Sequence, residues 1–324
     1  MKFLIPIVAI GFTLNLFGCA SADSAKANIK ATTKGSPFSF KELKSSNKVT
    51  LPSLQYMDAS DKTKLAYRAY TPKQVKATVL LFHGGGAHST AGYQHIGDGL
   101  SRDFDIAVFT PDIRGHGDSA GDRGDAPDPK QVLDDIGVFI RNIRKIYPDK
   151  PVFLAGHSSG AGLILNYSSF AAKEKVNGYL FISPHLGFRS ETELEKNSNP
   201  FAEAKTSLFV TNAMFGTNGN SKAVFFNYPK AVLDNDPKLI SAITVNMSNA
   251  LTPTSPSEQL KELSEPSAVW IGKEDEVLDA NKVIDYFYDN SPKSSAKMID
   301  NEKHLSILLT VSNNIGLFLQ NIAQ

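Results

Sequence analysis

The sequence is poor in cysteine and has no excess of either charge. Cys19 is its only cysteine among 324 residues, so no intramolecular disulfide can form. Lys and Arg number 34 against 33 Asp and Glu, and no basic stripe interleaved with aromatic residues is present. The composition therefore gives no electrostatic basis for binding nucleic acid.

Motifs for cofactors are also missing. The sequence contains no His-Glu-x-x-His, no calcium-binding loop and no Gly-x-Gly-x-x-Gly after its first buried strand pattern. We therefore expect neither a metal ion nor an organic cofactor. There is no internal repeat, and 41% hydrophobic with 21% charged residues is typical of a globular protein. A chain of this length forms one large domain, or one domain with an insertion.

No apolar run near the N-terminus is long enough to make a good membrane span. The stretch "FLIPIVAIGFTLNLFG" follows Lys2, is interrupted by Pro6, Gly11 and Asn15, and has the charge and length of a secretory h-region. One interpretation is an ordinary signal peptide that is cut after a small residue. The other is that "LFGC" resembles the lipobox of bacterial lipoproteins, in which Cys19 becomes the lipidated first residue.

We favour the lipoprotein interpretation, because a lone thiol at this position needs a reason other than a disulfide. It predicts a lipoprotein signal over 1–18 and lipid attachment at Cys19. Residues 19–50, rich in Ser, Ala and Lys, are expected to form a tether rather than a folded element. The protein would then be anchored to a membrane of the bacterial cell envelope.

Strand and helix patterns alternate from about residue 51 onward. An antiparallel hairpin is predicted where "LQYMDAS" and "KLAYRAYT" flank a turn. Further strands are predicted at 77–84, 105–112, 151–158, 176–184, 266–272 and 295–300, with helices at 90–103, 130–147, 159–173, 279–289 and 304–323. This alternation predicts an α/β fold with a doubly wound, mostly parallel sheet.

One segment interrupts the alternation. Residues 185–255 contain no clear strand pattern, and prolines, asparagines and glycines punctuate their apolar stretches. Roughly 70 residues are too many for a simple connection, so we expect a mostly helical cap inserted between two parts of the core, 51–184 and 256–324. Insertions at the carboxyl ends of parallel strands lie over the place where such sheets bind ligands.

The stretch "FLAGHSSGAG" places Ser158 between two glycines, where a predicted strand meets a predicted helix. A nucleophilic serine on such a sharp turn needs neighbours without side chains, at Gly156 and Gly160. A second glycine cluster, "HGGG" at 83–86, follows another buried strand pattern. Its backbone N–H groups could point at a developing negative oxygen, as an oxyanion hole requires.

A base for Ser158 is found by elimination. In a strand–turn–helix site of this kind the chain order is serine, acid, histidine. Of the seven histidines only His185 and His304 follow Ser158, and His185 comes directly after a strand with no room for an acid between. His304, after the last predicted strand, is the remaining candidate.

The acid is expected after the penultimate strand, where "VWIGKEDEVLD" has four carboxylates. Most acids in such a cluster are solvated loop residues. We choose Asp275, which is three residues beyond Gly272 and just before the apolar Val277, with Asp279 as the second choice.

These stretches together resemble an α/β-hydrolase of the monoacylglycerol lipase and lysophospholipase-like group (the serine aminopeptidase S33 grouping). The matching segments are "HGGGAHS" at 83–89, "PDIRGHGDS" at 111–119, "GHSSGAG" at 156–162, "GKEDEVL" at 272–278 and "EKHLSIL" at 302–308. They follow one another in the family's order and span almost all of the chain from about residue 51.

The resemblance implies acyl transfer to Ser158, with His304 as the base and Asp275 holding the imidazole. It also implies an oxyanion hole made by the backbone N–H groups of Gly85 and Ser159. The family often has a large residue after the nucleophile, whereas this chain has Ser159. The triple glycine resembles the hormone-sensitive-lipase branch.

The resemblance also implies that the loop at 111–119 is structural, with Arg114 and Gly115 shaping a turn and His116 packing. The expected activity is hydrolysis of carboxylic esters, with monoacylglycerol- or lysophospholipid-like substrates. The cap is rich in apolar residues, most of which are expected to pack the cap against itself and the core, while those on its inner face form the walls of a substrate channel. These residues are Phe188, Phe201, Leu208, Phe209, Val210, Met214, Phe215, Val224, Phe225, Phe226, Tyr228 and Val232.

Two other functions stay open. A serine aminopeptidase-like peptidase of the same fold needs an acidic pocket for the substrate amine, for which Glu191, Glu193 and Glu195 are candidates. A non-catalytic surface-binding lipoprotein is the second, although the complete order of serine, acid and histidine argues against it.

Overall fold

The computed structural model describes residues 43, 46, 48–194 and 200–322 of the chain. The predicted signal peptide, Cys19 and nearly all of the predicted tether before residue 48 lie outside these residues. None of the helices in the described part is long and apolar enough to cross a bilayer.

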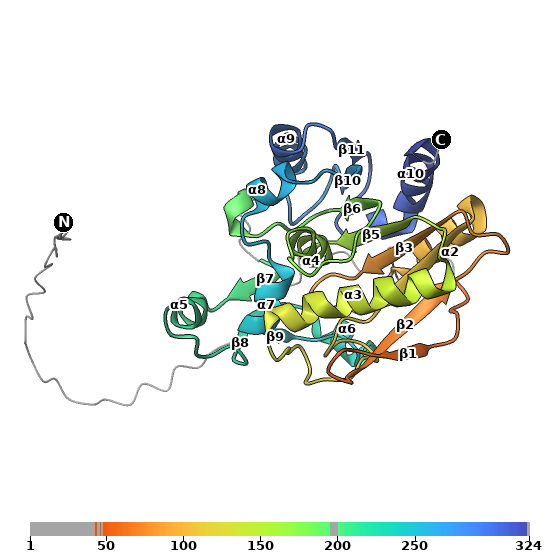
Figure 1. Cartoon of the computed structure of the whole chain (residues 1–324). Helices are drawn as coiled ribbons and strands as arrows, with labels where there is room; N and C mark the ends of the chain where they lie inside the picture. Colours follow the sequence, from red (N-terminus) through yellow and green to blue (C-terminus); the bar gives the residue numbers. More distant parts are fainter. Residues whose placement is uncertain (1–42, 44–45, 47, 195–199, 323–324) are drawn as a thin grey trace, which may run out of the picture. The chain divides into compact units, whose positions relative to one another are not determined.

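The core is an eight-stranded sheet with the order β1-β2-β4-β3-β5-β6-β10-β11 (Figure 1). The pairs β1–β2 and β2–β4 are antiparallel and all the others are parallel. The predicted hairpin and the mostly parallel sheet are therefore confirmed. The strands are β1 (Gln55–Asp58), β2 (Lys64–Tyr70), β3 (Ala77–Phe82), β4 (Ile106–Pro111), β5 (Val152–His157), β6 (Gly178–Ile182), β10 (Ser267–Gly272) and β11 (Ser295–Ile299).

Helices cover both faces of this sheet. The core helices are α2 (Gln94–Phe104), α3 (Pro129–Ile146), α4 (Ser159–Ser168), α8 (Pro256–Lys261), α9 (Ala280–Asn290) and α10 (Ile307–Ile322). Apolar side chains of α2 and α10 share one buried cluster, and those of α3, α4 and α9 share the other. Successive residues of a strand point to opposite faces, so Leu80 packs into one cluster and Leu81 into the other. The central strands are continuous apolar runs because both faces are buried.

The cap insertion differs from the prediction in one respect. It contains a three-stranded antiparallel sheet, β7 (Ala202–Ala204), β8 (Lys222–Phe226) and β9 (Ala242–Thr244), where no strand was expected. The expectation that this segment has no strand is wrong, because two of the strands are too short to show any periodicity. Its helices are η1 (Phe188–Ser190), α5 (Thr206–Phe215), α6 (Lys230–Asn235) and α7 (Val245–Leu251).

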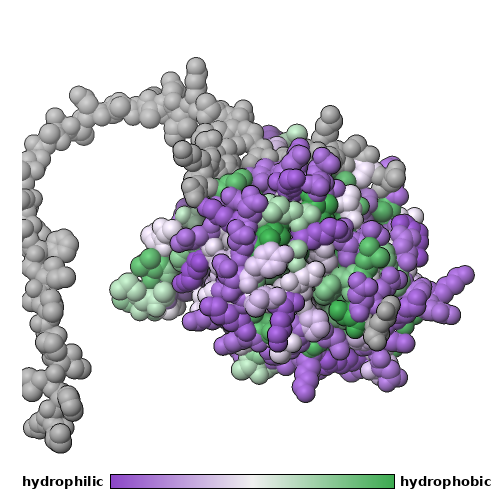
Figure 2. Space-filling model, turned by 90° about the horizontal axis from the view of Figure 1, so that it is seen from above, coloured by the Kyte–Doolittle hydropathy of each residue, from purple (hydrophilic) through white to green (hydrophobic). Residues whose placement is uncertain are grey.

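Helix α5 is apolar without being buried. None of its residues is buried, and Val210, Met214 and Phe215 are 55%, 68% and 69% exposed. Figure 1 shows it at the margin of the cap, and Figure 2 shows apolar side chains gathered on the lobe at the left of the molecule. These residues of the cap therefore do not form the walls of an internal channel.

The loop at 111–119 is held by buried charges. The Arg114 guanidinium pairs with Asp135 of α3 at 2.6 Å and with Asp61 at 2.9 Å. Its hydrogen bonds hold the pKa of Asp61 at about 2. Gly115 has a φ of 66°, and a Cβ there would lie 2.4 Å from the Asp122 carbonyl oxygen. The buried His116 ring packs against that of His83, with centroids 5.2 Å apart.

Candidate active site

Ser158 occupies a strained turn between β5 and α4. Its φ is 54° and its ψ is −125°, a conformation that L-residues rarely adopt. A Cβ at Gly156 would lie 2.2 Å from the Gly160 carbonyl oxygen, and one at Gly160 would lie 2.5 Å from the His83 carbonyl oxygen. Both glycines of the motif are therefore required by close backbone approach, which is the physical reason for their spacing around the serine.

His304 and Asp275 form a buried pair, as the sequence predicts. His304 Nδ1 lies 2.8 Å from Asp275 Oδ2, and both side chains are at most 1% exposed. The N–H groups of Val277 and Leu278 donate to Asp275 Oδ1 at 3.0 and 2.9 Å. Burial alone would raise the pKa of Asp275, but the His304 ring and these N–H donors outweigh it, so the pKa lies below its ordinary value. The carboxylate is therefore held ionised and fixed against the imidazole.

The neighbouring acids have other roles. Asp279 caps α9, accepting hydrogen bonds from the N–H groups of Asn281 and Lys282 at 3.0 and 3.2 Å. Glu276 accepts a hydrogen bond from the His304 N–H at 3.0 Å. Asp275 is the carboxylate of this loop that lies against His304 Nδ1.

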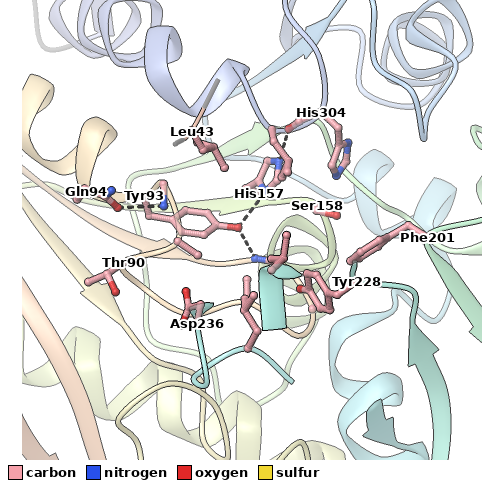
Figure 3. Close-up of a pocket in the computed structure, with 18 of the residues that line it drawn as sticks. Leu43, Thr90, Tyr93, Gln94, His157, Ser158, Phe201, Tyr228, Asp236 and His304 are labelled. Atoms are coloured by element: carbon pink, nitrogen blue, oxygen red, sulfur yellow. Dashed lines mark hydrogen bonds between the residues drawn. The ribbon is translucent and has the colours of Figure 1, made fainter. Parts of the chain in front are cut away.

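Ser158 and His304 both line a cavity of about 270 Å³ beneath the cap (Figure 3). Its apolar walls come from the core and from the cap, and three of the predicted cap residues contribute: Phe201, Tyr228 and Val232. Leu43 lines the same cavity. Since Leu43 belongs to the predicted tether, this part of the tether contacts the core.

In the described part of the chain, no three His, Cys, Asp or Glu side chains are arranged to hold a metal ion.

Gly85 and Ser159, whose N–H groups are the predicted oxyanion donors, are in contact, and the Gly85 N–H already has an acceptor within the protein. The N–H of Gly85, which lines the cavity, donates to Ser159 Oγ at 2.5 Å. The N–H of Ser159 belongs to the first turn of α4, where N–H groups have no acceptor within the helix. A substrate oxygen that uses the Gly85 N–H must therefore replace the Ser159 hydroxyl.

A hydrogen-bond chain that the sequence analysis missed connects the two loops of the site. The Gly84 N–H donates to the Tyr93 hydroxyl at 2.7 Å, which lies 2.9 Å from His157 Nδ1. His157 Nε2 in turn lies 2.9 Å from the His304 carbonyl oxygen. Since a carbonyl only accepts, His157 donates from Nε2 and accepts from Tyr93 at Nδ1. The only signal in the sequence is that His157 directly precedes the serine.

The buried histidines make folding sensitive to acid. Burial lowers the pKa of His83 from 6.5 to about 4 and that of His157 from 6.5 to about 3. The unfolded chain protonates them near pH 6.5 and the folded protein does not, so their contribution to stability is complete above pH 6.5 and is lost as the pH falls. At pH 5.5 each is expected to lower the free energy of unfolding by roughly 1 kcal/mol relative to pH 7.5.

Urea unfolding at the two pH values measures this difference. His157→Gln should remove roughly 1 kcal/mol of the pH dependence, because glutamine does not titrate. Equal stability of the wild type at pH 5.5 and 7.5 would contradict the prediction.

The acidic residues considered for an amine pocket are placed elsewhere. Glu193 pairs with His185 at 2.9 Å and Glu191 is exposed; neither lines the cavity, and Glu195 lies outside the described residues. Among the residues that the structure describes, the carboxylate that lines the cavity is Asp236 of the cap, which is 2.8 Å from His88 Nε2.

The profile of the family described as serine aminopeptidase, S33, matches residues 73–307. The chain belongs to this family. It is 36% identical to the monoglyceride lipase of Rattus norvegicus over 112 residues, which are 34% of this chain and 35% of that protein. The curated relatives that it matches are covered over 13% to 50% of their own length.

Solved structures show the same fold. A soluble variant of the Saccharomyces cerevisiae monoglyceride lipase, in complex with a substrate analogue, has a TM-score of 0.68 and 20% identity, covering 85% of this chain and 96% of that one. A thermostable carboxyl esterase from Bacillus coagulans, in complex with glycerol, has a TM-score of 0.63 and 19% identity, covering 85% and 100%. The predicted family and the α/β-hydrolase fold are therefore confirmed.

Proposed function

We propose that this family member is a serine hydrolase that cleaves carboxylic esters through an acyl-enzyme on Ser158. The observation that carries the proposal is the buried His304–Asp275 pair at 2.8 Å, whose histidine lines the same cavity as the serine on its strained turn. The likeness to monoglyceride lipases and to a carboxyl esterase supports an ester as the substrate.

In the proposed reaction, Ser158 Oγ attacks the ester carbonyl carbon while His304 Nε2 takes its proton. The carbonyl oxygen becomes an oxyanion, which the N–H groups of Gly85 and Ser159 stabilise. His304 then delivers the proton to the leaving alcohol, and water hydrolyses the acyl-enzyme by the same route. Asp275 keeps the imidazole in the required tautomer and stabilises its charged form.

The proposed substrates are monoacylglycerol-like or lysophospholipid-like esters. Phe201, Val232 and Leu305 give the cavity apolar walls. Each buried methylene of an acyl chain adds about 0.8 kcal/mol, which is roughly a fourfold gain in affinity per carbon. We therefore expect kcat/KM to rise with chain length beyond butyrate across a series of nitrophenyl esters, and monoglycerides to be better substrates than triglycerides.

Measuring kcat/KM from acetate to palmitate, and then on mono-, di- and triglycerides, tests this expectation. A flat or falling profile beyond butyrate without hydrolysis of any glyceride would leave only a small-ester hydrolase. Faster cleavage of aminoacyl nitroanilides than of esters would favour the peptidase. Failure of a fluorophosphonate to label the protein would favour a non-catalytic binding protein.

The lipid anchor is part of the proposal. Cys19 in its lipobox-like context, with a tether behind it, would hold the protein at a membrane of the bacterial cell envelope. At about 0.8 kcal/mol for each buried methylene, two or more acyl chains anchor firmly. Cys19→Ser is therefore expected to move the protein out of the membrane fraction. Mass spectrometry of wild-type protein that finds no lipid on Cys19 would contradict the anchor.

A further inference from the structure

The oxyanion loop, residues 83–88, is held by the cap as well as by the core. The Ile240 N–H donates to the Gly86 carbonyl oxygen at 2.8 Å, and Asp236 lies 2.8 Å from His88 Nε2. Ile240 and Asp236 both belong to the cap insertion. The cap is thus attached to the segment that carries the predicted oxyanion donor, and not only to the rim of the cavity.

The Phe226 ring, from β8 of the cap, makes the third of these contacts. A Cβ on Gly85 would lie 3.0 Å from Phe226 Cζ and 2.9 Å from Ser159 Oγ. A Cβ on Gly86 would lie 2.7 Å from Phe226 Cδ2. Gly85 therefore lies between the Ser159 hydroxyl and the Phe226 ring. A side chain at position 85 or 86 would meet this ring, which is a physical reason for glycine at both positions.

The Phe226 ring is itself fixed by other aromatic residues. It stacks on Phe201 with centroids 5.5 Å apart and planes at 27°, and the Tyr228 ring lies 6.2 Å away. Phe201 and Tyr228 line the cavity, whereas Phe226 does not. Phe226 can therefore affect the reaction through Gly85 without forming a wall against the substrate.

We propose that Phe226 is a positioning residue, and that its ring holds the Gly85 backbone where the N–H stabilises the oxyanion. The inference rests on the proposed ester hydrolysis and assigns the cap a part in the chemical step. An oxyanion donor acts only if it is fixed in place, and loss of one donor costs about 100- to 1000-fold in kcat. Displacement of a donor by about 1 Å has an effect of the same order.

The first experiment compares two leucine variants from the same strand on nitrophenyl butyrate. Phe226→Leu should lower kcat by roughly 10- to 100-fold and change KM by less than about threefold. Phe225→Leu is the matched control, because Phe225 packs against the Lys205 ammonium, 4.7 Å from its ring centroid. It should keep kcat near that of the wild type.

Phe226→Leu should also weaken an alkyl trifluoromethyl ketone, which adds to the serine and places an oxyanion in the hole. The loss should match the loss in kcat, while the affinity for an alcohol of the same chain length stays unchanged. A purely structural role in the cap would not separate these two ligands. Equal thermal unfolding temperatures of the two leucine variants establish that both are folded.

The second experiment asks whether a methyl group on residue 85 can replace the contact that is lost when the Phe226 ring is removed. Gly85→Ala alone should lose activity, because its methyl group meets the ring and the hydroxyl. In Gly85→Ala/Phe226→Leu the methyl group fills the space that the ring has left. The Ser159 hydroxyl, which also lies 2.9 Å from that methyl group, can rotate away, whereas a backbone carbonyl could not. The value of kcat should therefore recover at least tenfold over Gly85→Ala. Gly86→Ala is the control that Phe226→Leu should not rescue, since its φ is +73° and its Cβ would still lie 2.7 Å from the Ile240 carbonyl oxygen.

Three results would overturn the inference while the proposed function stands. They are a Phe226→Leu effect confined to KM, equal behaviour of the Phe225 and Phe226 variants, and losses of Gly85→Ala and Phe226→Leu that simply multiply. A wild-type protein that hydrolyses no ester and takes up no fluorophosphonate would overturn the proposed function, and this inference with it.

Discussion

Alanine in place of Ser158 is expected to lower kcat for ester hydrolysis by about a millionfold, to the level left by binding and the oxyanion donors alone. The serine oxygen is the atom that forms the bond to the acyl group, and no other hydroxyl is held on the strained turn between β5 and α4 among the residues described. The initial rate on nitrophenyl butyrate, with purified protein, measures the loss.

His304→Ala should be nearly as damaging, and the double variant should lose little more, because the two groups act as a unit. Ser169→Ala, at the end of the same helix α4, is the control and should keep wild-type kcat. Retention of more than about a tenth of the activity in Ser158→Ala would mean that the nucleophile is misassigned.

Asp275→Asn is expected to lower kcat by about ten-thousandfold. The amide removes the charge that stabilises the protonated imidazole, and its NH₂ group favours the wrong tautomer of His304. The change is nearly isosteric, and Oδ1 can still accept from the N–H groups of Val277 and Leu278. The fold should therefore survive, and kcat with the circular dichroism spectrum reports on both.

Asp279→Asn is the matched control for this prediction. Asp279 caps α9 through the N–H groups of Asn281 and Lys282, and asparagine caps a helix about as well as aspartate. Its kcat should stay near the wild-type value. If Asp279→Asn is the damaging change and Asp275→Asn is mild, the assignment of the acid is wrong.

The sequence predicts the core well because its strands are buried on both faces. Continuous apolar runs such as "ATVLLF" and "VFLAGH" end at turn residues, and their alternation with amphipathic helices such as α3 leaves few possible topologies. Chain order, with His185 excluded by its position, predicts His304 as the base, and the structure places its ring against Asp275. The cap lacks such signals, since β7 and β9 have only three residues each.

The contacts around the site could not be predicted because they join residues that are far apart in the chain. The pairing of His88 with Asp236 spans 148 positions, and that of Gly85 with Ser159 spans 74. Neither follows from periodicity or from a motif. In the sequence, the glycine triple predicts only backbone N–H groups that face a developing oxyanion. The structure adds a second reason for two of these glycines, because the Phe226 ring lies against them.

The order of the three site residues along the chain has a consequence for biosynthesis. Strand β5 and the Ser158 turn are made first, the cap follows, and the Asp275 and His304 loops are made only with the last strands of the sheet. A growing chain that has not reached Asp275 therefore contains the serine but neither the acid nor the histidine that would take its proton. Under the proposed mechanism the growing chain is therefore inert until His304 has been made and lies against Asp275.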